Sequence, residues 1–437
     1  MDLAFSVKLP SIQLPLGSIL SLTALRSGSP EELFMESRTN LIRALTEARA
    51  CTDAQFAMVR PDSLYERPIP ERHRIIFYLG HLEAFDWNLI GQHGCSLTSC
   101  NAEFDRLFAF GIDPPPGQLP SDKPSDWPSV AEVQRYNKAI RQALDAVLEE
   151  TAQQFLHVAL EHRLMHAETF AYILHNLPRD RKLARSANPP CSGPAPMHAM
   201  IDIPAGSATL GRVRGKGFGW DNEFDAHVVT VPGFAIGKYK VTNQQYLEFV
   251  RAGAEPPHFW TKCGDQWFWR TMAGEVPLPL DWPVYVTHEQ AQAYAAWVGK
   301  ALPAEVQFHR AAYGTSNGDE RPYPWGHELP DERRGNFGLH RWDPIPVTES
   351  TLGDSAFGVS QLVGNGWEWT ATVFHPFPGF EPFPFYPGYS APFFDGAHYI
   401  LKGASPGTAA HLLRRSFRNW FRLRYPYVYA GFRCVEN

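Results

Sequence analysis

The sequence of 437 residues has few cysteines, no long apolar run and no excess of positive charge. Its six cysteines are scattered at spacings that match neither a disulfide framework nor a CxxC zinc site, so we expect reduced thiols. No window approaches the roughly 18 uncharged apolar residues of a membrane span. Lys and Arg number 40 against 46 Asp and Glu, and no dense basic stripe is present, so nucleic acid is not an expected partner.

The amino-terminal segment also lacks the pattern of a secretory signal. One Lys precedes its apolar stretch, which Pro10 and Pro15 interrupt, whereas a secretory signal has a continuous apolar run behind a basic start. We therefore expect residues 1–28 to be a leader segment of a cytoplasmic protein that has no membrane partner. The remainder has the composition of folded domains, because 44% of residues are hydrophobic and only 20% are charged.

Helical signals dominate residues 29–184, for which we predict a four-helix bundle. Ser29 and Pro30 indicate the start of a helix over about 30–50, and Pro70 is predicted to open a second helix that ends by Gly94. Residues 113–128 are too rich in proline for a helix or strand. A capping box at Ser129 and Glu132 starts a pattern that runs to Leu177, and we split it near 149–152 into the last two helices.

A Pro- and Ser-rich linker at 185–198 separates this region from one of a different texture. Beyond it the chain has short β-like runs, many glycines and many aromatics. The expected elements are strands at 226–231 and 233–239 and helices at 243–251 and 288–298, while 353–437 is interpreted as largely loop. Residues 199–437 therefore predict an α+β domain with little regular structure.

Two histidines on the last predicted helix form a candidate metal site. His162 and His166 are four residues apart, so their imidazoles project from one face, and His81 on the second helix can complete the set. Facing helices of a bundle are where metal sites are built, and Glu168, Glu83 and Asp86 are close enough in sequence to orient the imidazoles. An isolated pair of this spacing is also common on protein surfaces and in cores, which leaves both interpretations open.

Longer motifs bring out a family resemblance. The segments FYLGHLEAFDW (77–87) and ALEHRLMHAETF (159–170) resemble the DinB-like half of the non-haem iron sulfoxide synthases, which join a sulfur donor to the imidazole of histidine or of trimethylhistidine (hercynine). From about 198 to 435 the chain resembles the C-type-lectin-like formylglycine-generating-enzyme (sulfatase-modifying factor) domain that these synthases also carry, with landmarks such as GNGWEWT (364–370). The resemblance covers nearly the whole chain.

This resemblance implies a set of ligands and substrates. It implies that His81, His162 and His166 bind Fe(II), with hercynine and dioxygen as partners. The family's hercynine site is an Asn-Trp pair, which corresponds here to Asn419 and Trp420. A tryptophan face is well suited to a quaternary ammonium, the group that hercynine carries.

Departures from the family pattern bear on the donor. Synthases that take γ-glutamylcysteine follow the Asn-Trp pair with Asp and Arg anchors, and this chain has Phe421 and Tyr425 instead. Arg422 and Arg424 either replace these anchors or lie on the surface. A sugar carries no carboxylate, so the loss of charged anchors favours the selenoneine branch of the family, which uses a selenosugar donor.

Two further departures lie near the expected metal. Met165 stands where many ergothioneine synthases have Gln, and Phe374 and Phe377 follow GNGWEWT where related synthases carry a proton-donating tyrosine. The next tyrosine is Tyr386, and we assign no catalytic acid or base from the sequence.

Three alternatives remain beside a selenoneine synthase. The first is an ergothioneine-type sulfoxide synthase that uses cysteine or γ-glutamylcysteine. The second is a DinB-like thiol transferase with another divalent metal at the same histidines. The third is a binding module without catalysis, since the lectin-like fold also occurs in proteins that only bind ligands. The copper oxidase chemistry of formylglycine-generating enzymes is excluded, because residues 403–420 contain no cysteine.

Overall fold

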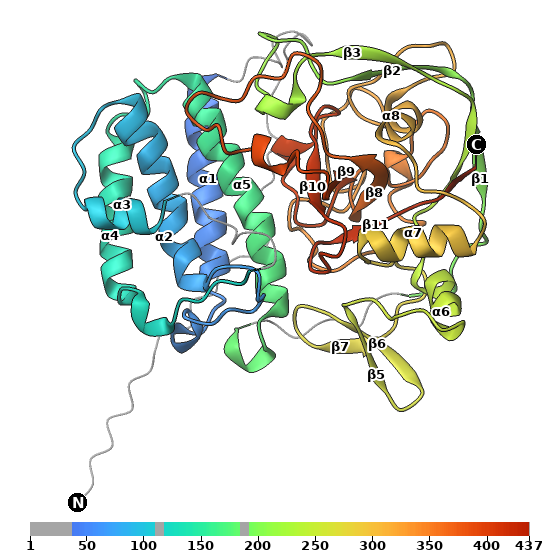
Figure 1. Cartoon of the computed structure of the whole chain (residues 1–437), viewed down its shortest axis with the longest axis horizontal. Helices are drawn as coiled ribbons and strands as arrows, with labels where there is room; N and C mark the ends of the chain where they lie inside the picture. The colour runs from blue at the N-terminus through green and yellow to red at the C-terminus, as the bar shows by residue number, and fades with distance from the viewer. Residues whose placement is uncertain (1–36, 110–117, 184–191, 437) are drawn as a thin grey trace, which may run out of the picture.

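The computed structural model describes residues 37–109, 118–183 and 192–436, and we call residues 37–183 the helical part. Its helices are α1 (Arg38–Phe56), α2 (Ile75–Asp86), α3 (Ala102–Leu107), α4 (Val130–Asp145) and α5 (Gln153–Asn176), and a π-helical segment η3 (Trp87–Gly94) continues α2. The long helices α1, α2, α4 and α5 pack side by side (Figure 1). The helices of the predicted bundle are present, and their likeness to DinB proteins stays a prediction. None of the described helices is long and apolar enough to cross a membrane.

Capping explains where two of these helices begin. The Ser129 side chain accepts a hydrogen bond from the Glu132 backbone N–H, and the Glu132 carboxylate accepts one from the Ser129 backbone N–H. Helix α4 therefore starts at the predicted capping box. The predicted break near 149–152 is confirmed, because α4 ends at Asp145 and α5 begins at Gln153. The first helix differs from its prediction: Ser37 caps a helix that starts at Arg38, and the start near residue 30 lies outside the described residues.

The second helix also begins later than predicted. Pro70 lies in a turn, and Arg74 is the extended residue ahead of a helix that starts at Ile75. Proline is tolerated at a first helical position but does not impose one, so the apolar run from Ile75 decides where the helix begins. The predicted end at Gly94 is confirmed, as the last residue of η3.

Residues 192–436, which we call the carboxyl-terminal part, contain short strands and three helices. The strands are β1 (Met200–Ile203), β2 (Gly206–Leu210), β3 (His227–Val231), β4 (Phe234–Gly237), β5 (Trp260–Cys263), β6 (Gln266–Arg270), β7 (Glu275–Pro277), β8 (Gly366–Val373), β9 (His398–Ala404), β10 (Asn419–Arg422), β11 (Ala430–Gly431) and β12 (Val435–Glu436). The helices are α6 (Asn243–Arg251), α7 (His288–Trp297) and α8 (Glu305–Tyr313). The largest sheet has the order β10-β9-β8-β11, and the others are β1-β4-β12, β5-β6-β7 and β2-β3.

The predicted elements of this part are mostly present. Helices α6 and α7 and strands β3 and β4 lie within a residue or two of their predicted ranges. Most residues of 353–436 lie outside strands, as predicted, but the prediction missed β8, β9 and β10, which belong to the largest sheet. Strand β8 is buried over its first five residues and shows no in-out alternation, which is why the sequence pattern missed it. The α+β class is confirmed.

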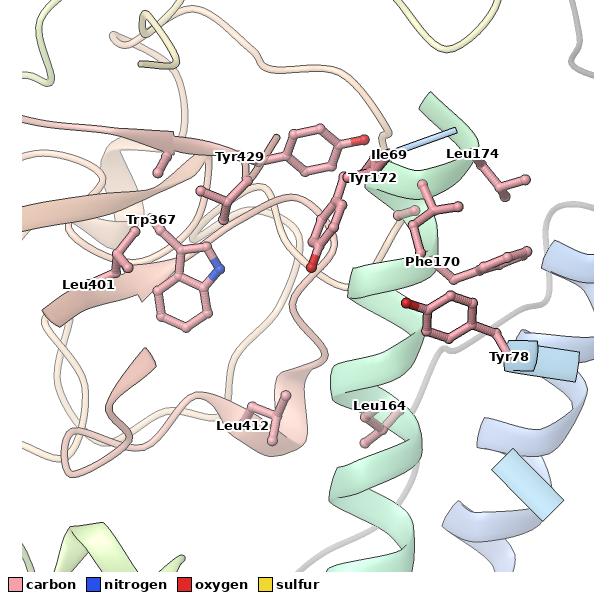
Figure 2. Close-up of a cluster of buried hydrophobic side chains, with 14 of the residues drawn as sticks. Ile69, Tyr78, Leu164, Phe170, Tyr172, Leu174, Trp367, Leu401, Leu412 and Tyr429 are labelled. Atoms are coloured by element: carbon pink, nitrogen blue, oxygen red, sulfur yellow. The ribbon is translucent and has the colours of Figure 1, made fainter. Parts of the chain in front are cut away.

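One apolar core runs through both parts. Figure 2 shows Trp367 of β8 and Leu401 of β9 on the side of Tyr172 of α5. Leu412 of the carboxyl-terminal part lies near Leu164, which is also on α5. These side chains are almost fully buried. Helix α5 is therefore the surface on which the carboxyl-terminal part packs, and it places residues of β8–β10 beside the helical part.

Candidate metal and substrate site

Three histidines from two helices meet inside the protein. His81 projects from α2, and His162 and His166 project from successive turns of α5. One ring nitrogen of each lies within 4.8 Å of the others. Their ring centroids are separated by 4.4 Å (His162 to His166), 4.9 Å (His81 to His166) and 5.2 Å (His81 to His162). The structure thus brings together the three residues that the sequence singled out.

The chemical state of these imidazoles suits a divalent ion. Burial lowers the pKa of His81 to about 4 and lowers the pKa of His162 and His166 well below the ordinary value, so all three rings are neutral. His81 Nδ1 lies 2.9 Å from the Phe108 carbonyl oxygen, to which a neutral ring donates its proton, leaving a lone pair on Nε2. His81 Nε2 and the Nδ1 atoms of His162 and His166 are buried without a hydrogen-bond partner among the described residues. These residues fit a metal ion.

Aromatic rings enclose the histidines. Phe85 stacks on His162 with ring centroids 3.4 Å apart and an angle of 8°, and Phe77 stacks on His81 at 4.9 Å. The stacking limits rotation of both imidazoles and keeps water from the helix side of the site.

The nearby carboxylates have partners other than the imidazoles. Arg163 Nη2 donates to Asp86 at 2.7 Å, and its Nη1 donates to Glu83 at 3.1 Å. Glu168, expected to orient an imidazole, instead accepts hydrogen bonds from Trp367, Ser405 and Thr408 of the carboxyl-terminal part. Among the described residues, the polar group that holds a triad imidazole is the Phe108 carbonyl, which the sequence did not indicate.

A cavity of about 410 Å³ opens beside the triad and is lined by both parts of the chain. That volume is in the range of small-molecule sites. The cavity does not reach Glu83 or Asp86, but it is lined by the other site residues expected from the sequence: His81, His162, His166 and Glu168 from the helical part, and Asn419, Trp420, Phe421, Arg422, Arg424 and Tyr425 from the carboxyl-terminal part. Residues more than 250 positions apart in the sequence thus face one space.

Trp420 lies in an aromatic environment within this cavity. Phe374 stacks against one of its faces at 4.2 Å and 6°, while the rings of Tyr389 and Phe393 lie 5.4 Å and 5.6 Å from it. Asn419 Oδ1 accepts the Trp420 backbone N–H at 2.9 Å. Phe374 therefore covers one face of the Trp420 indole, and two further aromatic rings lie within 6 Å of it.

The donor-pocket candidates divide into inward and outward groups. Phe421 and Tyr425 stack at 5.0 Å, and Tyr425 Oη accepts a hydrogen bond from Arg72 Nε at 2.9 Å. Arg424 is largely exposed and donates to Glu289 at 2.8 Å, and Arg422 is also exposed. Two further arginines line the cavity: Arg418, which is buried and paired with Glu305, and Arg72, which is partly buried and which no sequence signal distinguished from other arginines.

A tyrosine also lines the cavity near the triad. The Tyr386 ring centroid lies 6.5 Å from that of His162 and 5.3 Å from that of Phe85. From the sequence, Tyr386 was only the first tyrosine after two phenylalanines at 374 and 377. The loop between β8 and β9 folds back over the cavity, and this return could not be inferred from residue spacing.

Comparison with known proteins agrees with this architecture. Residues 187–437 match the sulfatase-modifying factor enzyme 1-like domain. The chain is 35% identical over 339 residues to the hercynine oxygenase of Mycolicibacterium thermoresistibile, a match that covers 70% of this chain and 75% of that protein. The chain belongs to the hercynine oxygenase family. The names of its relatives make this a family of oxygen-dependent, oxidoreductase-type enzymes.

Two further members of the hercynine oxygenase family and its pathway are similar over different lengths. The hercynine oxygenase of Mycobacterium tuberculosis is 39% identical over 238 residues, which are 49% of this chain and 55% of that protein. The ergothioneine biosynthesis protein 1 of Neurospora crassa is 28% identical over 87% of this chain and 56% of its own length. The chain thus spans about half the length of these two relatives.

Proposed function

We propose that this chain is an iron(II)- and dioxygen-dependent synthase that joins a chalcogen donor to hercynine at the imidazole carbon between the two nitrogens. The observation that carries the proposal is a buried triad of neutral imidazoles that opens onto the same cavity as Asn419 and Trp420. In the reaction, the imidazole loses its C–H proton and the donor its S–H or Se–H proton. Dioxygen takes up the electrons, one oxygen atom joining the chalcogen and the other leaving as water.

His81, His162 and His166 are the residues that would hold iron. Bound there, iron(II) would supply a redox-active centre with open coordination positions for dioxygen chemistry. The chain keeps the ligands ready by fixing the His81 tautomer through the Phe108 carbonyl and by stacking Phe85 on His162.

Asn419 and Trp420 are assigned to the acceptor. The open face of Trp420 attracts the trimethylammonium group, and the neighbouring rings of Tyr389 and Phe393 make its surroundings apolar. Asn419 Oδ1 already accepts the Trp420 backbone N–H, so the side-chain NH2 group of Asn419 is the part that donates to the acceptor's carboxylate or imidazole.

Tyr386 is assigned to proton transfer. Its phenol lines the cavity beside His162 and comes from the loop that covers the triad, and burial raises its pKa, which keeps the hydroxyl protonated. A hydroxyl there holds a proton near the reacting chalcogen and returns it to reduced oxygen.

The finer proposal concerns the donor, which we assign to a neutral selenosugar, as in a selenoneine synthase. Phe421 and Tyr425 supply an apolar wall with one hydroxyl, and the Arg424 guanidinium is bonded to Glu289. A donor carboxylate or ammonium buried against this wall would lose hydration without gaining a partner, which costs several kcal/mol. A polyhydroxylated donor has no such charges.

A second candidate rests on Arg72. This cation lines the cavity beside Tyr425, so it could bind the carboxylate of cysteine or γ-glutamylcysteine, which would make the protein an ergothioneine-type sulfoxide synthase.

The test begins with metal analysis of anaerobically purified protein and oxygen uptake on addition of hercynine. We expect iron and hercynine-dependent uptake; without either, the synthase proposal fails. The donor is then decided by competition, with selenosugar, cysteine and γ-glutamylcysteine supplied together and products identified by mass spectrometry. We expect the selenosugar product. An exclusively cysteine-derived product that disappears in Arg72→Met supports the second candidate instead.

A further inference from the structure

Two buried carboxylates flank the metal-binding histidines on α5. Glu161 immediately precedes His162, and Glu168 lies two residues after His166. They are seven residues apart, two helical turns, so they share one face of α5. Both are at least 93% buried, and neither contacts the triad. The face they occupy is the one that packs against the carboxyl-terminal part.

Glu168 binds one residue of strand β8 and two residues of the loop that follows β9. Its Oε1 accepts from Trp367 Nε1 at 2.6 Å and from Ser405 Oγ at 2.5 Å, and its Oε2 accepts from Thr408 Oγ1 at 2.8 Å. The loop lies so close that a Cβ on Gly407 would be 3.1 Å from Glu168 Cγ. Three neutral donors, one from β8 and two from this loop, fix the carboxylate in one position.

Glu161 is bound by an arginine and an indole. Arg414 donates from both terminal nitrogens, at 2.6 Å and 2.9 Å, and Trp220 Nε1 donates at 2.8 Å. Arg414 also pairs with Glu223, which in turn accepts from Ser416 at 2.7 Å. A bidentate pair of this kind constrains angle as well as distance.

The partners of Glu168 and of Glu161 are connected to the Asn-Trp pair through the sheet or along the chain. Trp367 is in β8, Ser405 follows the last residue of β9, and β9 pairs with β10 so that Trp420 lies opposite Ile400. Arg414 is five residues before Asn419 along the chain. Glu168 therefore holds the strands that carry β10, and Glu161 holds the segment that leads into it.

We infer that Glu161 and Glu168 are positioning residues that set the placement of Asn419 and Trp420 relative to the histidine triad. The inference rests on the proposed function for the identity of the bound acceptor. The ligands and the carboxylates lie on the same rigid helix, so the bonds to Glu161 and Glu168 fix β10 at one distance from the metal. A misplacement of about 1 Å between acceptor and metal can lower the rate on the order of a hundredfold.

The experiment compares Glu168→Ala with Glu168→Gln. Alanine removes all three hydrogen bonds, so we expect stoichiometric iron, a raised KM for hercynine and a kcat/KM lower by on the order of a hundredfold. Glutamine keeps the size and the acceptor oxygen, and we expect it to recover most of the loss. Hydrogen exchange of residues 405–422 should be faster in the alanine variant, with α2 unchanged.

A matched control is Glu320→Gln. Glu320 pairs with Arg415 at 2.9 Å, next to Arg414, and does not line the cavity, so kcat/KM should stay at the wild-type value. If Glu168→Ala does not fold, Thr408→Val removes a single donor and should raise the KM with iron unchanged.

Three results overturn the inference: a wild-type KM and wild-type exchange in Glu168→Ala, a wild-type KM in Thr408→Val, or loss of iron in proportion to activity. If the wild-type protein shows no hercynine-dependent oxygen uptake, the proposed function is wrong instead. The exchange measurement needs no substrate, so in that case it still decides whether Glu168 holds β10.

Discussion

Replacing Trp420 with leucine removes the aromatic face that we assign to the trimethylammonium group of hercynine. Phe374 covers one face of the indole at 4.2 Å, so one face remains for a cation. The rings of Tyr389 and Phe393 lie within 6 Å of the indole and make its surroundings apolar, which strengthens attraction between the cation and the indole. Leucine keeps an apolar side chain at the position but has no π electrons.

The magnitude follows from the degree of desolvation. A cation over tryptophan in a water-excluded site gains about 2 kcal/mol, which corresponds to about a thirtyfold difference in affinity. Histidine has a primary ammonium that stays hydrated and gains less. The ratio of the two dissociation constants, histidine over hercynine, should therefore fall in Trp420→Leu, by at most about thirtyfold.

The assay is calorimetric titration of both ligands into wild-type protein, Trp420→Leu and Phe374→Leu. Phe374→Leu is the matched control, because it removes the ring behind Trp420 and leaves the assigned face in place. We expect Phe374→Leu to keep most of the wild-type ratio between the dissociation constants of histidine and hercynine. A ratio unchanged in Trp420→Leu, with both ligands weakened equally, would refute the reasoning, since the loss would then reflect apolar contact alone.

Three further predictions concern other groups. His81→Ala should lose most of the iron because two imidazoles remain, whereas His93→Ala, outside the triad, should keep it; metal analysis decides. Tyr386→Phe should lower kcat on the order of a hundredfold with iron and hercynine KM unchanged, and a wild-type kcat would remove its assignment as proton donor. Burial raises the pKa of Asp343 from 3.8 to about 6, so its contribution to stability is full below pH 4 and is lost as pH rises through 6. Between pH 5 and pH 8 this fall amounts to about 1.4 kcal/mol in the free energy of unfolding in urea, and Asp343→Asn should remove it.

Local signals in the sequence predicted local structure well. The Ser129 capping box and the ends of α6 could be predicted because a few neighbouring residues determine them. The β8–β9–β10 sheet could not, since β8 is buried in a continuous run and its strand partners lie far along the chain. Pairing over such distances leaves no periodic trace in a single sequence.

In the candidate site too, features set by neighbouring residues could be predicted, and features set by long-range contacts could not. The spacing of His162 and His166 predicted a shared face, and His81 on the second predicted helix was expected to complete the set. The partners of Glu168 lie 199, 237 and 240 residues away, so its role at the interface could not be read from its proximity to His166. Arg72 and Tyr386 were missed for the same reason, because each reaches the cavity only through the tertiary fold.

Three successive residues of α5 point to three different neighbours. Glu161 binds Arg414 of the carboxyl-terminal part, His162 faces the cavity, and Arg163 binds Glu83 and Asp86 of α2. The helix therefore cannot turn about its axis or move away from either neighbour without breaking buried ion pairs. We expect substrates to enter and products to leave through the existing mouth of the cavity, past the exposed Arg422 and Arg424, and not by separation of the two parts of the chain.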